Sequence, residues 1–261
     1  MNRIHVSWLL LSCLFEISIS GCSGIPHQQS WGASANLPAI KVIKRAALNA
    51  AKDPATWAPL SGAALLSIGN WDEELSEWAA EKQPVFGGNG RDASDKLRDA
   101  AAIAYLVTAF AAPSETAGDK ARGLTVGLAT IALQQGITHS LKSITSRVRP
   151  DGRTKSSFPS GHAAIASSSA TLARRNLDYL ELADWANSVS RFALWSVTAG
   201  TAWARVESEK HFVSDVLVGM ALGHYVAAFM HEAFMEADVK GVSVNFHPAP
   251  SGGLLIFRVP I

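Results

Sequence analysis

The sequence predicts an all-α fold, a helical bundle with a small β-hairpin at its C-terminal end. Apolar residues recur at helical spacing over most of the chain, from Leu37 to Ala237. Apolar residues make up 48% and charged residues 17% of the 261 positions, against a typical charged share of about 25%. This composition is typical of an alanine-rich helical globule or of a small membrane protein. The strand-like runs Val242–Phe246 and Leu254–Val259 flank Pro248–Gly253 and predict the hairpin.

The N-terminus has the layout of a secretory signal. Arg3 gives a positive start, Trp8–Phe15 an apolar run too short to span a membrane, and Ile19–Cys22 an end of mostly small residues. These last four residues resemble the bacterial lipobox, whose cysteine is acylated and becomes the first residue of the mature protein. The sequence therefore predicts a signal peptide over residues 1–21 and a lipid anchor at Cys22. Secretion with an unmodified Cys22 is the alternative.

One domain is expected after the anchor. Residues 22–36 are polar and contain Gly24, Pro26 and Gly32, which predicts a tether, and residues 37–261 are long enough to form a single domain with its own core. Cys13 leaves with the signal and Cys22 carries the lipid, so no thiol remains for catalysis, zinc or a disulfide. The net charge of +1 gives no field of one sign that would favour nucleic-acid binding.

The helices are expected in a fixed order along the domain. A first helix follows Leu37, Pro54 and Pro59 interrupt the chain, and further helices are predicted over residues 60–68, 71–82, 93–112, 117–148, 160–176, 181–203 and 211–237. In the helix predicted over residues 71–82, Trp71, Leu75 and Trp78 face one way and predict a buried stripe. A membrane span needs about 20 apolar residues. The best candidate, Ala100–Pro113, is shorter, so buried helices are predicted, with membrane insertion as the alternative.

The first group of candidate site residues is Lys142, Arg149 and Pro150. Two cations seven positions apart lie near one face of a helix, which Pro150 is expected to end. An ammonium and a planar guanidinium together suit the oxygens of a phosphate. A basic helix end that only complements the helix dipole explains the same pattern.

The second group is Phe158-Pro159-Ser160-Gly161-His162, directly before an alanine-rich helix. Ser160 is a natural N-cap, and the free N–H groups of the first turn form an anion site. Gly161 lets the backbone approach a ligand closely, and His162 is placed to protonate a departing oxygen. A capped helix with an incidental histidine is the alternative.

The third group is Arg205, His211 and Asp215. If His211 opens a helix, Asp215 lies four positions later on the same face and hydrogen-bonds one ring nitrogen. That bond fixes the tautomer and leaves the other nitrogen free as a nucleophile. A surface ion pair is the alternative.

Taken together, the three groups resemble the type 2 phosphatidic acid phosphatase superfamily, which shares its fold and site with vanadate-dependent haloperoxidases. The resemblance extends from about Ala93 to Ala237 and rests on ten positions in order: Lys142, Arg149, Pro150, Pro159, Ser160, Gly161, His162, Arg205, His211 and Asp215. One position departs from the family pattern, because Ala204 stands where a serine is usual.

The resemblance implies a role for each residue. The phosphate oxygens would be held by the Ser160 side chain, the Gly161 amide and three cations, Lys142, Arg149 and Arg205. His211 would attack phosphorus to form a phosphohistidine, and Asp215 would orient it. His162 would protonate the leaving group and later help to activate water.

The sequence thus predicts a hydrolase of phosphate monoesters or pyrophosphates that works without metal or other cofactor. Its substrate would be a phosphorylated lipid or a small phosphomonoester, and nucleic acid is not expected as a partner. The predicted anchor would hold the enzyme to a membrane on the periplasmic side of a bacterial envelope, at the outer membrane. Two alternatives are a vanadate-dependent haloperoxidase and a non-catalytic lipoprotein that binds phospholipid.

Overall fold

The computed structural model describes residues 30–35, 37–235, 243–249 and 252–258. The predicted signal peptide and the lipid anchor at Cys22 lie outside these residues. Within them, the all-α prediction is confirmed by eight helices: α2 (Ile40–Lys52), α3 (Pro54–Leu66), α4 (Trp71–Lys82), α5 (Gly90–Ala111), α6 (Ala117–Thr145), α7 (Gly161–Leu177), α8 (Asp184–Glu207) and α9 (Val213–Phe234). Two strands, β1 (Ser243–Ala249) and β2 (Gly252–Arg258), pair antiparallel.

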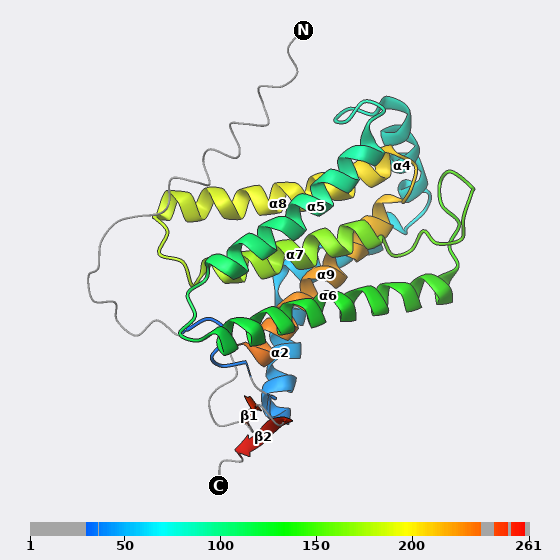
Figure 1. The fold of residues 1–261 in the computed structure, drawn as a ribbon. Coiled ribbons are helices and arrows are strands. Elements are labelled where there is room, and N and C mark those ends of the chain that lie inside the picture. Colours follow the sequence, from blue (N-terminus) through cyan, green and yellow to red (C-terminus); the bar gives the residue numbers. More distant parts are fainter. Residues whose placement is uncertain (1–29, 36, 236–242, 250–251, 259–261) are drawn as a thin grey trace.

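Helix α7 lies at the centre of the bundle. Figure 1 shows α5 and α8 on one side of α7 and α9 and α6 on the other, and α7 packs against all four. Most of its side chains are buried, and most of the buried ones are alanine, serine or threonine. Such small residues let neighbouring helices approach. Cβ atoms at Gly219 and Gly223 of α9 would come within 2.5 Å of the Ser160 carbonyl oxygen and 2.2 Å of that of Ala164, so the approach of α9 requires glycine at both positions.

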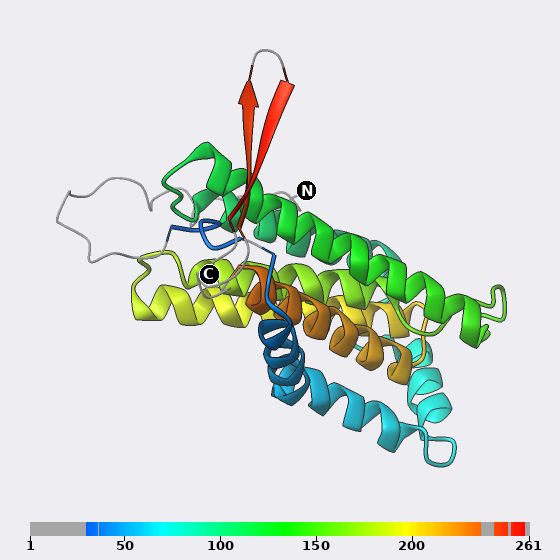
Figure 2. The ribbon, with the colours of Figure 1, turned by 90° about the horizontal axis from the view of Figure 1, so that it is seen from below.

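Helices α2 and α3 pack against α9, and Figure 2 shows α3 running beside it. The predicted start of the second helix at residue 60 is wrong, because α3 begins at Pro54 and continues through Pro59. The Asp53 carboxylate accepts a hydrogen bond from the Ala55 amide (2.9 Å) and caps the helix. Proline is well suited to the first helical position, so Asp53 and Pro54 together form a strong start signal.

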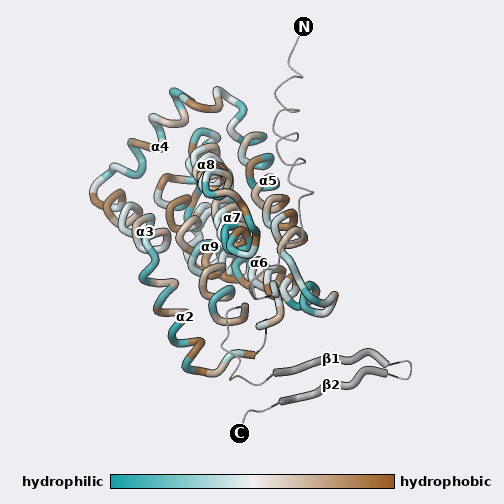
Figure 3. The backbone as a smooth tube through the Cα atoms, turned by 90° about the vertical axis from the view of Figure 1, so that its left-hand side faces the viewer, coloured by the Kyte–Doolittle hydropathy of each residue, from teal (hydrophilic) through white to brown (hydrophobic). Residues whose placement is uncertain are grey.

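Helix α9 is the one described helix whose length and composition would suffice to cross a membrane. The sequence placed the best candidate at Ala100–Pro113 instead. Most of the apolar window of α9 is buried within the bundle, and Figure 3 shows α9 between α3 and α7.

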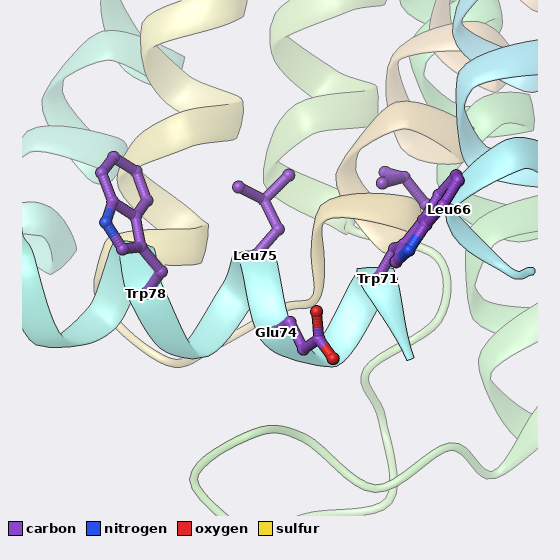
Figure 4. A pocket seen from close by; sticks show the side chains of 5 residues that line it. All are labelled: Leu66, Trp71, Glu74, Leu75 and Trp78. Carbon is purple, nitrogen blue, oxygen red and sulfur yellow. The ribbon is translucent and has the colours of Figure 1, made fainter. Parts of the chain in front are cut away.

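The orientation predicted for α4 is wrong. Its buried residues are Asp72, Ser76 and Ala79, whereas Trp71 is 57% and Trp78 47% exposed. The polar side is buried because it caps the start of α9: Asp72 accepts from the Ser214 amide (2.8 Å) and Ser76 from the Val213 amide (3.1 Å). Figure 4 shows the other side of α4, where an open pocket of about 400 Å³ is lined by Leu66, Trp71, Glu74, Leu75 and Trp78.

The last residues of the predicted tether pack onto the domain. Trp31 is buried, and its Nε1 donates to the Asn176 side chain on α7 (2.9 Å). On α6, a Cβ at Gly123 would lie 2.4 Å from the Trp31 ring, so glycine makes room for the indole. The packed structure therefore begins before Leu37, the predicted domain boundary.

Candidate active site

The first two cations come from the end of α6 and from the loop after it. Lys142 lies in the last turn, where its Nζ donates to the Ser156 carbonyl (2.6 Å). The prediction that Arg149 shares this helix is wrong. The helix ends at Thr145, because Ser146 adopts a left-handed conformation (φ 46°) well before Pro150. Arg149 therefore reaches the site from a loop.

Three cations are close enough to perturb one another. Burial, followed by the charge of Arg149, lowers the pKa of Lys142 to about 8. Burial and the same Arg149 charge lower the pKa of Arg205, in the last turn of α8, to about 10. The Nε atoms of Arg149 and Arg205 are shielded from solvent and have no hydrogen-bond partner. Half-buried or buried cations that repel one another, two of them with an unused donor, form a site for an anion.

The start of α7 lies beside these cations. Ser160 is buried at the N-cap position, as predicted, and its Oγ accepts a long hydrogen bond from the Ala163 amide (3.5 Å). A Cβ at Gly161 would lie 4.0 Å from Lys142 Cε, so the lysine side chain passes the first residue of the helix. The lysine side chain thus lies beside a helix N-terminus, where free N–H groups favour an anion.

His162 is held by two side chains of α5. Its Nε2 lies 2.6 Å from Asp95 Oδ1 and 2.7 Å from Arg98 Nη1. A protonated Nε2 donates to Asp95, and a deprotonated Nε2 accepts from Arg98. Burial and then the charge of Arg205 lower the pKa of His162, while the hydrogen bond to Asp95 opposes them. The sequence patterns had not indicated Asp95 or Arg98.

His211 is buried beside Asp215. It does not open a helix as expected, since α9 begins two residues later and Asp215 is its third residue. His211 Nδ1 lies 3.7 Å from Asp215 Oδ2, which is longer than a hydrogen bond. Burial is the main reason that the pKa of His211 falls to about 4, so the imidazole is neutral at pH 7.

The Asp215 carboxylate has other donors nearer than His211. Oδ1 accepts from Arg147 (2.9 Å), and Oδ2 accepts from Ser157 Oγ (2.5 Å) and from the Phe212 amide (2.9 Å). Burial raises the pKa of Asp215, but neighbouring hydrogen bonds and the Arg147 charge bring it below the ordinary value. The carboxylate is therefore ionised and fixed in place.

Arg147 connects this carboxylate to α4. Its Nη1 also donates to Ser214 Oγ (2.8 Å), its Nη2 donates to Asp72 Oδ2 (2.8 Å), and the guanidinium lies 4.0 Å from the centre of the Phe212 ring. The sequence patterns indicated neither Arg147 nor Asp72. Arg147 stands only two positions before Arg149, and this proximity was the one signal available.

Ala204, the departure from the family pattern, is fully buried on α8. A Cβ at Gly90, the first residue of α5, would lie 2.8 Å from the Ala204 carbonyl oxygen. The start of α5 thus packs against α8 at this position.

Comparisons with known proteins agree with the three motif groups. The family model of the PAP2 superfamily matches residues 123–237, which include every candidate residue from Lys142 to Asp215. A lipid A 1-phosphatase of Porphyromonas gingivalis is 37% identical over 93 residues, which cover 36% of this chain and 20% of that protein. The chain thus matches about a fifth of the length of this curated relative.

A solved structure is also similar. It is the crystal structure of a transmembrane PAP2 type phosphatidylglycerolphosphate phosphatase from Bacillus subtilis, with a TM-score of 0.42 and 22% identity; the match covers 72% of this chain and 90% of that one. The segment 123–237, which carries all three motif groups, thus matches the PAP2 superfamily.

Proposed function

We propose that the protein is a phosphoric monoester hydrolase that removes phosphate from a phosphorylated lipid through a phosphohistidine intermediate. One observation carries the proposal. The half-buried Lys142 and Arg149 and the buried Arg205 perturb one another, Lys142 passes the N-terminus of α7, and the neutral His211 lies within the electrostatic influence of Lys142 and Arg205.

Binding and attack follow from the charges. Lys142, Arg149 and Arg205, with the Ser160 hydroxyl and the Gly161 amide, hold the phosphate oxygens. Nδ1 of His211 faces Asp215, so Nε2 carries the lone pair that attacks phosphorus. The new N–P bond forms as the P–O bond to the alcohol breaks, and Asp215 stabilises the positive charge on the ring.

His162 completes both halves of the cycle. It donates its proton to the departing oxygen and becomes neutral. It then accepts a proton from the water that attacks the phosphohistidine, which releases inorganic phosphate and regenerates both histidines. Asp95 orients the ring in the resting enzyme, and the leaving-group oxygen takes the place of that contact in the complex.

The lipid substrate is proposed on two grounds. The curated relative that aligns with the motif region is a lipid A 1-phosphatase, and the lipid anchor expected at Cys22 would hold the site beside a membrane. A lipid anchor on the periplasmic side of the outer membrane is part of the same proposal.

The test is release of inorganic phosphate from a panel of substrates: phosphatidate, lipid A, an isoprenyl pyrophosphate and a soluble aryl phosphate. We expect turnover of at least one lipid, persistence in excess chelator, inhibition by vanadate and no activity in the His211→Ala variant. Restoration by magnesium of an activity lost in chelator, or labelled phosphate on a residue other than His211, would contradict the mechanism. A soluble phosphate ester as the only substrate would contradict the lipid assignment.

A further inference from the structure

A second cavity, of about 90 Å³, is lined by residues of α3, α7, α8 and α9, and Figure 3 shows α3, α7 and α8 around α9. Its polar wall is formed by Ser167, Thr171, Arg174 and His224. A helix rises about 1.5 Å per residue, so Arg174 lies about 18 Å along α7 from His162. None of the residues proposed for catalysis lines this cavity.

The Arg174 guanidinium lacks a complete set of partners. Its Nε is shielded from solvent and has no hydrogen-bond partner. Burial, followed by the charge of Arg191, lowers the pKa of Arg174, although a guanidinium stays protonated in proteins. The carboxylates whose charges act on it are engaged elsewhere: Asp53 contacts His224 Nε2 (3.1 Å), and Asp178 accepts from Arg191 (2.5 Å). A half-buried guanidinium with a free donor fits an oxyanion.

One turn before Arg174 on α7, a hydroxyl group faces the same cavity. Thr171 Oγ1 lies 2.9 Å from His224 Nδ1, and His224 Nε2 contacts the Asp53 carboxylate. Because Nε2 faces the Asp53 carboxylate, the neutral ring carries its proton on Nε2, and Nδ1 accepts from the Thr171 hydroxyl. This chain of three buried or half-buried groups has no part in the proposed hydrolysis.

Outside the cavity, α8 carries an exposed apolar strip of four residues spaced along one face: Trp185, Val189, Phe192 and Trp195. Each is at least 59% exposed. Trp195 lines the cavity and stacks on Phe192, with ring centres 6.2 Å apart. Tryptophan side chains of this kind are typical of the boundary between lipid chains and headgroups. The strip therefore ends at a cavity whose lining includes the Arg174 guanidinium.

We propose that this cavity binds the phosphate group of an anionic phospholipid whose acyl chains lie along the apolar strip of α8. Arg174 donates to the phosphate oxygens. The site is separate from the active site, and its occupant is held without being hydrolysed. The inference does not depend on the proposed function.

The probe is dihexanoyl phosphatidylglycerol, a short-chain phosphodiester that has no phosphomonoester to remove. Calorimetric titration of the full-length protein should show binding that weakens at least about tenfold in Arg174→Gln, as expected for loss of a charged hydrogen bond. Arg191→Gln is the matched control. It removes the same charge nearby, from a guanidinium already bound to Asp178 and Asn187, and should weaken binding less than about threefold. Both variants should keep the turnover of the wild type, which shows that they fold.

Equal affinity of the wild type and Arg174→Gln for the phospholipid would overturn the site. Octyl glucoside, a neutral amphiphile, should bind more weakly and without dependence on Arg174; equally tight binding would overturn the role of phosphate. Inorganic phosphate tests the source of the anion. If phosphate binds in a manner that Arg174→Gln abolishes while the phospholipid does not bind, the lipid assignment is overturned.

Discussion

At the scale of single residues, the site depends on two histidines with opposite requirements. His211 attacks only when neutral, and burial holds its pKa at about 4. His162 must carry a proton to release the alcohol, and its pKa lies below the ordinary value of 6.5. The two requirements overlap only under acidic conditions.

The expected pH profile of kcat/KM is therefore a bell with its maximum between about pH 4 and 6.5. Activity falls below this range as His211 gains a proton, and above it as His162 loses one. His162→Ala should remove the alkaline limb and lower the rate about 10²–10⁴-fold on an alkyl phosphate, but less on an aryl phosphate, whose phenolate departs without protonation. An optimum above pH 8 would contradict these assignments.

A second prediction concerns Arg147, which shares its donors between Asp215 and Asp72. Arg147→Gln leaves two buried carboxylates without their cation, so it should lower the unfolding free energy by about 3 kcal/mol or more. It should also raise the pKa of Asp215 and move the acid limb of the profile upward. Arg147→Lys keeps the charge but loses the planar guanidinium that donates to both carboxylates. Its activity should therefore lie between that of Arg147→Gln and that of the wild type.

Arg153→Gln is the control for this comparison, because Arg153 is exposed in the same loop. It should leave both the profile and the stability close to those of the wild type. An Arg147→Gln variant that loses stability but keeps the position of its acid limb would show that the role of Arg147 is only structural.

At the scale of elements, the sequence predicted the residues of the three motif groups but not all of their supports. Spacing and capping signals indicated Ser160 and the start of α7. By contrast, Asp72 and Asp95 are single acidic residues on helices rich in charge, where nothing in the sequence shows which carboxylate is buried. The error in α4 has the same origin. Large tryptophans were expected inside, but the polar side had a partner, the start of α9, that only the folded chain supplies.

The packing of α7 against α9 gives an element-scale prediction. Gly223→Ala places a Cβ about 2.2 Å from the Ala164 carbonyl oxygen, a backbone atom that cannot move without shifting α7. The variant should lose about 1–3 kcal/mol of stability and much of its activity. Gly136→Ala on α6 is the matched control, because no atom lies within 4 Å of its Cβ. The control should gain up to about 1 kcal/mol from helix propensity, and equal thermal denaturation of the two variants would contradict the packing argument.

At the scale of the whole molecule, the segment that matches the PAP2 family model does not contain all the residues that support the site. The PAP2 segment begins at residue 123, but α5 supplies Asp95 and packs between α7 and α8, and α4 supplies Asp72. The surface also carries many large exposed apolar residues, among them Trp57, Ile103, Phe110, Trp185 and Phe192. Such a surface offers a route to membrane contact beside the proposed lipid anchor.

The last prediction separates these two routes. Cys22→Ser removes the atom that would be acylated, so labelled fatty acid should no longer be incorporated. If the anchor is the main attachment, the variant should leave the membrane fraction in a carbonate wash while wild-type protein stays. Phe192→Ser in the intact Cys22 background is the control, because it reduces exposed apolar area without touching the anchor, and it should remain in the membrane. A Cys22→Ser protein that resists the wash would show that the helices themselves hold it, and the proposal of a lipid-anchored enzyme would then fail.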